Sequence, residues 1–454
     1  MQSFSPAQPP LEFIPPKFNP WVLKGAQTIL PAVINLKTNI NAIEGRELET
    51  LVKLWQQFQA KQIRLLIAFR HPSVADPLVM MELFRRLLPH QANQMGISLN
   101  SPIHSHFIYD RGIPLWAGKT VEWLFPRLGG TPIQRGRFDS LGLKSARRLF
   151  VDGQFPLMAS PEGGTNGHNQ IVSPLEPGMA QLSFWCAQDL ETQGRTEQVV
   201  ILPVGIQYCY DHEPWAGIDL LLSELEQELN IDIDTKVNQS RYERLYGLGK
   251  GMLMLMEKFY TQAYSHQFPP LPNPEQMNNE IFSARLQNLL DVCLQVAEDY
   301  FKVAAKGTTI DRCRRLEQIG WDRIYRQEFR EVENLAPVEV SLANLVATEA
   351  QLRLCICGWW KNFVAVSGQY VKEQPSADRF ADTLLIIHEG IARIKGEKSK
   401  PAPSLGKRNA MITIGQPIAA SDRYPGYKQD RRCAKKAVTD LTLELQSRLE
   451  SLIM

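Results

Sequence analysis

The sequence predicts an α/β protein, with a mixed sheet flanked by helices and a large all-helical insertion. Between residues 63 and 206, short apolar runs of strand length alternate with segments of helical length, which is the pattern of a sheet covered on both faces. From about residue 209 the strand signals nearly disappear, and they return only near residue 410. With 454 residues, 44% hydrophobic and 22% charged, the chain is long enough for two domains or for one domain with a large insertion.

The first predicted segment covers residues 1–62. Residues 1–20 contain six prolines and are expected to be extended. The mostly apolar stretch 21–36, in which Lys24 is the only charge, predicts a helix that lies either at a membrane interface or on the protein core. Residues 48–59 have the pattern of a second helix that leads into the first strand.

Three further segments follow. Residues 63–208 are the predicted α/β core, residues 209–408 the helical insertion, and residues 409–454 the last core strand and C-terminal helix. The expected strands are 63–69, 106–109, 155–159, 198–206 and 410–418, with core helices at 77–88 and 428–452; the helices expected in the insertion are 241–265, 278–305, 311–330, 338–366 and 378–396.

The turn after the first core strand contains a histidine and an aspartate, His71 and Asp76, separated by four residues. A strand followed by a turn and a helix places such side chains at the mouth of a sheet. A carboxylate can then hold one imidazole nitrogen and leave the other as a fixed acceptor, which is what a general base requires. The alternative is a core histidine whose ring is satisfied by a backbone carbonyl. The sequence therefore predicts His71 and Asp76 as candidate catalytic residues.

A second turn, 160–167, follows the strand at 155–159 and contains three glycines and one carboxylate, Glu162. Glycines such as Gly163 and Gly164 let backbone N–H groups approach a ligand closely, and Glu162 can accept a proton or orient a donor. The alternative is that the glycines only make the turn and Glu162 only caps it. Between the two turns, residues 129–135 present the cation Arg135, which either binds an acceptor or forms an ordinary surface ion pair.

A fourth segment, residues 199–206, is an apolar run that contains Pro203 and predicts a buried strand. In chain order, the turn with His71 and Asp76, the segment 129–135, the Pro-Glu-Gly turn at 161–163 and this strand resemble the motifs of the glycerolipid (glycerol-phosphate) acyltransferase superfamily. That family carries His-x4-Asp, a Gly…Ile-x-Arg block, Pro-Glu-Gly, and an apolar strand with a proline; its late Gly-x-Pro-Ile strand joins the same sheet. The resemblance implies a fatty acyl transfer from a thioester, acyl-CoA or acyl carrier protein, to a hydroxyl of a glycerolipid such as lysophosphatidate or glycerol 3-phosphate. It implies no metal and no bound cofactor. The residues that it assigns are His71 and Asp76 for catalysis, and Arg135, Glu162, Gly163, Gly164 and Thr165 for substrate binding.

Two positions depart from the family pattern. Arg70 stands where the family often has Asn, and Asn166 stands where a cation commonly follows the glycine turn. In the resemblance that cation helps to hold the acceptor's phosphate, so its replacement weakens the case for a phosphate-bearing acceptor. Arg70, Arg135 and Arg137 are the cations that can compensate.

Composition narrows the class of partner. A net charge of +2 gives no global attraction to nucleic acid. The chain has no uninterrupted apolar run of about 18 residues and opens on a polar, proline-rich stretch, so the expectation is a cytoplasmic protein with peripheral membrane contact. The lipid acceptor is what the resemblance implies. His104 and His106 have strand spacing, but no third ligand is close to them in the sequence, which argues against a metal site.

Two other functions stay open. A thioesterase or lipase-type hydrolase would use the same base to activate water, although the chain has no Gly-x-Ser-x-Gly elbow. A non-catalytic lipid-binding scaffold would place the role in the helical insertion. There, Met252, Met254 and Met256 suit either a tunnel for a fatty chain or an ordinary helix core.

Overall fold

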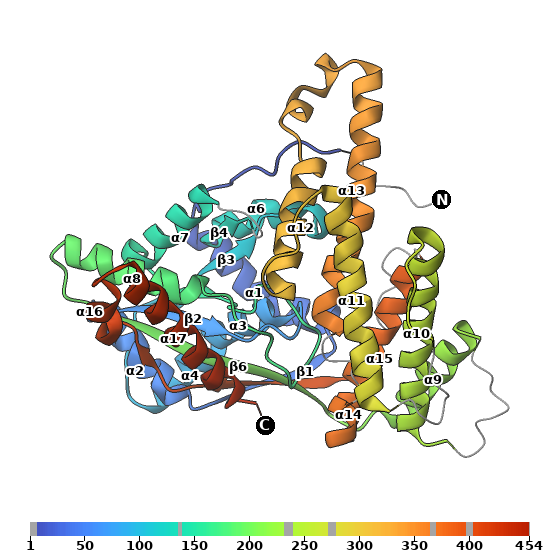
Figure 1. Cartoon of the computed structure of the whole chain (residues 1–454). Coiled ribbons are helices and arrows are strands. Elements are labelled where there is room, and N and C mark those ends of the chain that lie inside the picture. Colours follow the sequence, from blue (N-terminus) through green and yellow to red (C-terminus); the bar gives the residue numbers. More distant parts are fainter. Residues whose placement is uncertain are drawn as a thin grey trace. The chain divides into compact units, whose positions relative to one another are not determined.

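The computed structural model describes residues 7–134, 139–230, 239–270, 278–363, 369–395 and 403–453, and the chain divides into two compact units. One consists of Glu12–Asp211 and Lys407–Met454, and the other of Met1–Leu11 and His212–Gly406. The chain leaves the sheet of the first unit after strand β6 and returns to it at strand β7, and His212–Gly406 between these strands belong to the second unit (Figure 1).

The first unit is built on a mixed eight-stranded sheet in the order β1-β7-β6-β2-β5-β3-β4, with β8 paired to β6. Strands β6, β2, β5, β3 and β4 are mutually parallel, and β7 and β8 run antiparallel to β6. The strands are β1 (Ile40–Arg46), β2 (Ile63–Phe69), β3 (His106–Asp110), β4 (Gly130–Ile133), β5 (Leu157–Ala159), β6 (Gln198–Tyr210), β7 (Arg408–Ile414) and β8 (Ile418–Ala419). The prediction of a mixed sheet flanked by helices is thus confirmed, whereas the assignment to an acyltransferase fold stays a prediction.

Helices cover both faces of this sheet. Strand β2 is buried along its whole length because it lies between β5 and β6, with apolar helix faces above and below. Alternate residues of β2 point to the two sides: Leu65 and Ile67 join a core cluster with α1–α4, and Leu66 and Ala68 join a cluster with α7, α8 and α17. The helices are α1 (Pro20–Lys37), α2 (Leu48–Gln59), α3 (Asp76–Glu82), α4 (Leu88–Gln94), α5 (Ile113–Ala117), α6 (Lys119–Arg127), α7 (Ser140–Asp152), α8 (Gly178–Thr192), α16 (Tyr424–Tyr427) and α17 (Arg431–Glu450), with a π turn at Leu83–Leu87 and a 3₁₀ turn at Ser421–Arg423.

Within its described residues, the second unit is helical apart from one isolated bridge between Gln8 and Tyr325. That bridge holds Tyr325 extended, so the helix expected over 311–330 ends at Ile324 and a 3₁₀ segment follows. Residues 364–366 of the helix expected over 338–366 lie outside the described residues. The helices are α9 (Trp215–Glu228), α10 (Arg241–Tyr264), α11 (Asn279–Phe301), α12 (Thr309–Ile324), α13 (Pro337–Phe363), α14 (Gln369–Glu373) and α15 (Ala377–Ile394), with the 3₁₀ segment at Gln327–Asn334.

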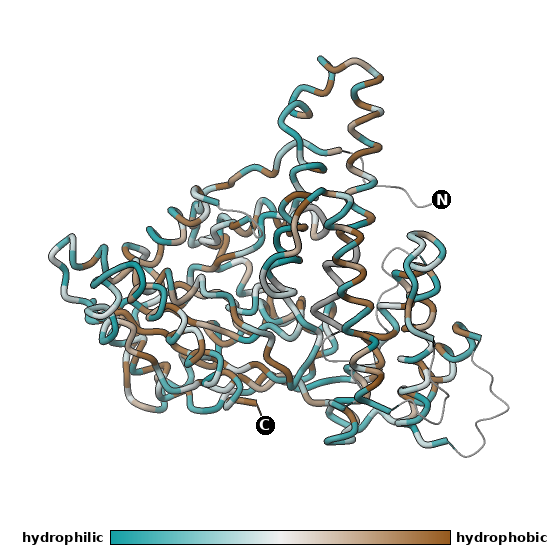
Figure 2. The backbone as a smooth tube through the Cα atoms, in the orientation of Figure 1, coloured by the Kyte–Doolittle hydropathy of each residue, from teal (hydrophilic) through white to brown (hydrophobic). Residues whose placement is uncertain are grey.

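Hydropathy follows the burial of these elements. The longer helices alternate between apolar and polar residues along their length (Figure 2), as expected of helices with one face on a core. In α10, Met252 and Met256 are buried in the helix core, while Met254 is 46% exposed. No helix among the described residues is long and apolar enough to span a bilayer.

Candidate functional site

The carboxyl ends of the parallel strands bring the two predicted turns together. Strand β2 pairs with β5 through Ala68 and Ala159, and with β6 through Phe69 and Val204. The chain after β2 therefore emerges beside the chain after β5, although about 90 residues separate them in the sequence. This edge of the sheet is where open α/β folds bind their ligands.

His71 and Asp76 form a direct pair across the turn after β2. The Nδ1 atom of His71 lies 2.8 Å from Oδ2 of Asp76, and the aspartate side chain is fully buried. Because a carboxylate can only accept here, the neutral imidazole carries its proton on Nδ1 and presents the lone pair of Nε2. Nε2 has no hydrogen-bond partner among the described residues, and the imidazole is 22% exposed. The geometry is that of an oriented general base open to a ligand.

The Asp76 carboxylate is held by two further donors. Its Oδ2 atom accepts from the backbone N–H of Ser73 at 2.8 Å, and its Oδ1 atom accepts from the hydroxyl of Tyr208. Asp76 is also the first residue of α3, where the helix dipole favours a negative charge. Burial, and then the neighbouring carboxylate, raise the pKa of Tyr208 well above its usual value, so the phenol stays a donor.

Glu162 is buried and binds groups of both turns. Its Oε1 atom accepts from the backbone N–H of His71 at 2.8 Å and lies 3.9 Å from Nε of Arg70. Its Oε2 atom accepts from the Asn166 amide at 3.1 Å and from the Ser173 N–H at 3.0 Å. From the sequence, Glu162 was expected either to bind substrate or to cap the turn. In the structure its carboxylate faces protein groups and its side chain has no exposed surface. Its contacts position His71 rather than reach solvent.

Arg70 fixes the loop that follows the second turn. Its guanidinium is fully buried and donates to the carbonyls of His168 (2.9 Å), Asn169 (2.5 Å) and Ile171 (2.8 Å). The suggestion that Arg70 compensates for a missing phosphate-binding cation is therefore wrong, because those carbonyls and Glu162 surround the guanidinium. Asn166 is likewise buried, at 1% exposure.

The glycine turn contributes two partly exposed residues, Gly164 and Thr165, beside Gly163. Gly163 has φ +68°, and a Cβ there would lie 2.2 Å from the Glu176 carboxylate, so the backbone requires glycine. Gly164 and Thr165 are partly exposed, and within the part of the chain that the structure describes their N–H groups have no hydrogen-bond partner. These two amides are candidate donors to a developing negative charge.

Arg135 lies outside the described residues, as does Arg137, so their positions stay predictions. The residues that flank them are described. Asp139 caps α7 and accepts from the backbone N–H of Gln134 at 2.9 Å, just after β4. Because β4 is parallel to β3, β5 and β2, Gln134, the last described residue after β4, lies at the same edge of the sheet as His71.

His104, just before β3, and His106, its first residue, both have rings that contact backbone oxygens. His104 and His106 are buried, and their rings contact the backbone oxygens of Leu128 (2.7 Å) and Gly129 (3.0 Å). Burial lowers the pKa of His104 to about 4, so the ring is neutral at physiological pH. No cluster of three metal-ligating side chains occurs in the described ranges.

One cavity of the α/β unit lies at the other edge of the sheet. It measures about 590 Å³ and is lined by residues that precede β2, β5 and β6, among them Lys61, Pro156 and Glu197. These are the amino ends of the parallel strands, whereas His71 follows the carboxyl end of β2. This cavity therefore does not contain the His71–Asp76 pair.

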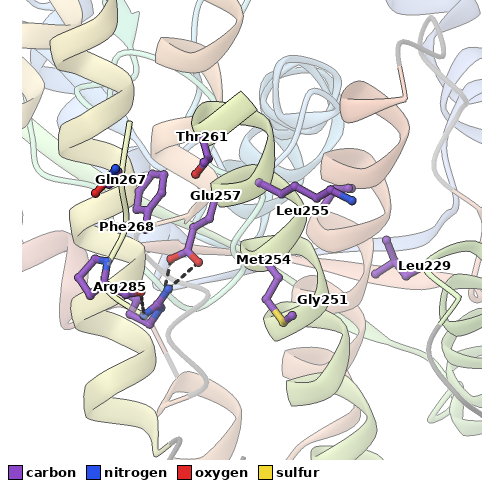
Figure 3. A pocket seen from close by; sticks show the side chains of 11 residues that line it. Leu229, Gly251, Met254, Leu255, Glu257, Thr261, Gln267, Phe268 and Arg285 are labelled. Atoms are coloured by element: carbon purple, nitrogen blue, oxygen red, sulfur yellow. Dashed lines mark hydrogen bonds and ion pairs between the residues drawn. The ribbon is translucent and has the colours of Figure 1, made fainter. Parts of the chain in front are cut away.

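The helical unit has a pocket of its own (Figure 3), of about 670 Å³. Arg285 of α11 donates to Glu257 of α10 at 3.1 and 2.6 Å, and to the carbonyls of Pro269 (3.0 Å) and Pro270 (3.2 Å). This buried ion pair joins the two helices to the chain after α10 and leaves the guanidinium occupied by protein groups. Apolar side chains, including Met254, Leu255 and Phe268, line the pocket together with the polar side chains of Lys258, Thr261 and Gln267.

Tyr208 and Asn169 belong to the site but were not predicted. Asn169 pairs with the backbone of Tyr208, whose N–H donates to Oδ1 of Asn169 at 2.6 Å. The sequence holds no local signal for either residue, because their partners lie 39 and 132 positions away. The apolar run at 198–206 predicted a buried strand, but neither its pairing with β2 nor which of its side chains meets Asp76.

Neither a family model nor a curated protein matches this chain. The resemblance to glycerolipid acyltransferases therefore rests on the order and spacing of the motifs.

Proposed function

We propose that this protein transfers a fatty acyl group from a thioester, acyl-CoA or acyl carrier protein, to a hydroxyl of a glycerolipid such as lysophosphatidate or glycerol 3-phosphate. The observation that carries the proposal is the His71–Asp76 pair, with Nδ1 held at 2.8 Å from a buried carboxylate and Nε2 left without a protein partner among the described residues. The ordered motifs of the sequence, which resemble those of glycerolipid acyltransferases, supply the reaction class.

The reaction needs one base and one set of oxyanion donors. Nε2 of His71 takes the proton of the acceptor hydroxyl as the oxygen attacks the thioester carbonyl, and Asp76 stabilises the imidazolium that forms. The N–H groups of Gly164 and Thr165 are the proposed donors to the oxyanion. Collapse of the tetrahedral intermediate breaks the C–S bond, and the departing thiolate takes the proton back from His71. The acceptor is the nucleophile, so no acyl-enzyme is required.

A hydrolase, the second candidate, would use the same base on water. The geometry of His71 does not itself distinguish water from an alcohol as the proton donor. Product analysis does: transfer gives an ester of the acceptor, whereas hydrolysis gives a free fatty acid whether or not an acceptor is present.

The cation proposed for the acceptor's phosphate is Arg135. If the acceptor carries phosphate, Arg135→Ala should raise the acceptor KM about tenfold or more and leave the donor KM nearly unchanged, because a charge-assisted bidentate contact is lost. Initial-rate kinetics with lysophosphatidate and palmitoyl-CoA measure both constants. Arg148→Ala, on the exposed surface of α7, is the matched control. Equal changes in the two KM values, or none, would place Arg135 outside acceptor binding.

We further propose peripheral membrane contact through α1. Its inner face is buried at Leu23, Leu30 and Ile34, while Trp21 (77%), Ile29 (58%) and Leu36 (78%) are exposed on the other side. The sequence predicted a helix that lies either at a membrane interface or on the protein core. Helix α1 has a feature of each, because one face packs on the core and the other presents apolar side chains outward. A lipid-dissolved acceptor would be reached from such a surface.

Liposome flotation tests this contact. The triple variant Trp21→Ser, Ile29→Ser, Leu36→Ser should bind vesicles of phosphatidylcholine and phosphatidylglycerol about tenfold or more weakly, because each buried apolar side chain contributes about 1.5–3 kcal/mol. The control is Leu443→Ser, which removes an apolar side chain that is 61% exposed on α17. Equal flotation of the triple variant and the unaltered protein would remove α1 as the contact.

A further inference from the structure

Tyr208 occupies a position that links the central strand to the candidate base. It lies on β6, next to β2, and is 2% exposed. Its backbone is paired with the side-chain amide of Asn169, which accepts from the Tyr208 N–H at 2.6 Å and donates to its carbonyl. The Arg408 guanidinium lies over the aromatic ring, 5.0 Å from its centre. Backbone and ring are therefore both fixed before any ligand binds.

The hydroxyl of Tyr208 controls one oxygen of Asp76. Oδ2 of Asp76 is bound by Nδ1 of His71 and by the N–H of Ser73, each at 2.8 Å, and Oδ1 is bound by the Tyr208 hydroxyl. A carboxylate bound on one oxygen alone is free to rotate about its Cβ–Cγ bond. With donors on both oxygens, only one orientation satisfies every partner, and that orientation presents Oδ2 to the imidazole.

We propose that Tyr208 is a positioning residue, whose hydroxyl fixes the Asp76 carboxylate so that His71 keeps its proton on Nδ1 and its lone pair on Nε2. The effect on the tautomer stands on the geometry alone, while the effect on catalysis rests on the proposed acyl transfer. Tyr208 touches no reacting atom; its hydroxyl also meets the side chain of Ser73, and the role proposed for it runs through Asp76.

The tautomer can be read without substrate. In protein labelled with ¹⁵N-histidine, the neutral imidazole of His71, identified by the signal lost in His71→Ala, should appear as the Nδ1–H tautomer. In Tyr208→Phe, which removes only the hydroxyl, we expect a measurable share of Nε2–H tautomer. An unchanged Nδ1–H tautomer in Tyr208→Phe would overturn the proposal.

Kinetics supply the second readout. Tyr208→Phe should lower kcat about 10- to 100-fold with KM nearly unchanged, as expected for the loss of a hydrogen bond to a charged group. The matched control is Tyr427→Phe, which also loses a hydroxyl contact, with Gln181 at 2.8 Å, in the same unit. In an Asp76→Asn background, Tyr208→Phe should add no further loss; additive losses would contradict action through Asp76.

A second variant tests the role of Tyr208 if Tyr208→Phe does not fold, and one outcome separates this role from the proposed function. If Tyr208→Phe does not fold, Tyr208→3,5-difluorotyrosine retains a hydroxyl that is more acidic, and the Nδ1–H resonance of His71 should shift; no shift would overturn the proposal. If the tautomer responds to Tyr208 but the unaltered protein transfers no acyl group, the positioning role stands and the proposed function fails.

Discussion

His71→Ala should lower acyl transfer about 10²- to 10⁴-fold and leave the fold intact. The rate falls because Nε2 of His71 is the only proton acceptor assigned to the attacking hydroxyl. Stability should change little, because the imidazole is 22% exposed and the Asp76 carboxylate keeps its bonds from Ser73 and Tyr208. Initial rates with labelled palmitoyl-CoA, together with a thermal melt, measure both effects.

His90→Ala provides the control for this variant. His90 is an exposed histidine of α4, and among the described residues its ring lies within hydrogen-bond distance of the Gln94 amide alone (3.1 Å), so its loss should alter neither rate nor melting. Full activity in His71→Ala would refute His71 as the base. A His71→Ala protein that is unfolded would instead make the histidine a structural residue.

Glu162→Ala should destabilise the α/β unit by about 3–5 kcal/mol. The side chains of Glu162 and Arg70 are fully buried, and removing the carboxylate leaves the guanidinium without its counter-charge. The substitution also frees the N–H groups of His71 and Ser173 from their acceptor, so the turn that carries the base loses its anchor. Chemical denaturation in the absence of substrate measures the change in the free energy of unfolding.

Glu191→Ala is the control that separates the effect of burial from the loss of an ion pair as such. Glu191 forms an ion pair with Lys428 in which both side chains are about half exposed, and solvent screening leaves such a pair little influence on stability. Glu162→Gln, which keeps the shape of the side chain, should lie between Glu162→Ala and the unaltered protein. If Glu162→Ala melts normally but raises the KM for a substrate, Glu162 is a binding residue, as the sequence alone suggested.

The sequence predicted the contact between side chains that lie within one turn, but it did not predict the contacts between residues that are far apart along the chain. His71 and Asp76 lie within one turn, so their spacing alone predicted that they meet. Glu162 was found as a lone carboxylate in a glycine turn, but its role depends on contacts with Arg70 and His71, about 90 residues earlier. Burial decides that role, and one sequence without its fold does not show which charged side chains are buried.

The same distinction applies to the fold. The apolar run at 63–69 predicted the bounds of β2 but not the strands that pair with it. A central strand covered on both faces is the easiest kind to find, because all of its residues are apolar or buried. Strand β1 was missed because its burial alternates irregularly at the sheet edge, and β4 because only four residues pair, one of them Pro132. Helix α9 was missed although its Leu221, Leu222 and Leu225 are buried in the helical unit.

The measurement that tests the central claim most directly is a product assay with the full chain. Purified protein is incubated with palmitoyl-CoA labelled in the acyl group, with and without lysophosphatidate, glycerol 3-phosphate or a neutral long-chain alcohol, and His71→Ala is run beside it. Our account predicts a labelled ester that appears only with a hydroxyl acceptor and is lost in His71→Ala. Labelled free palmitate formed at the same rate with and without acceptors, or an ester formed equally well by His71→Ala, would contradict it.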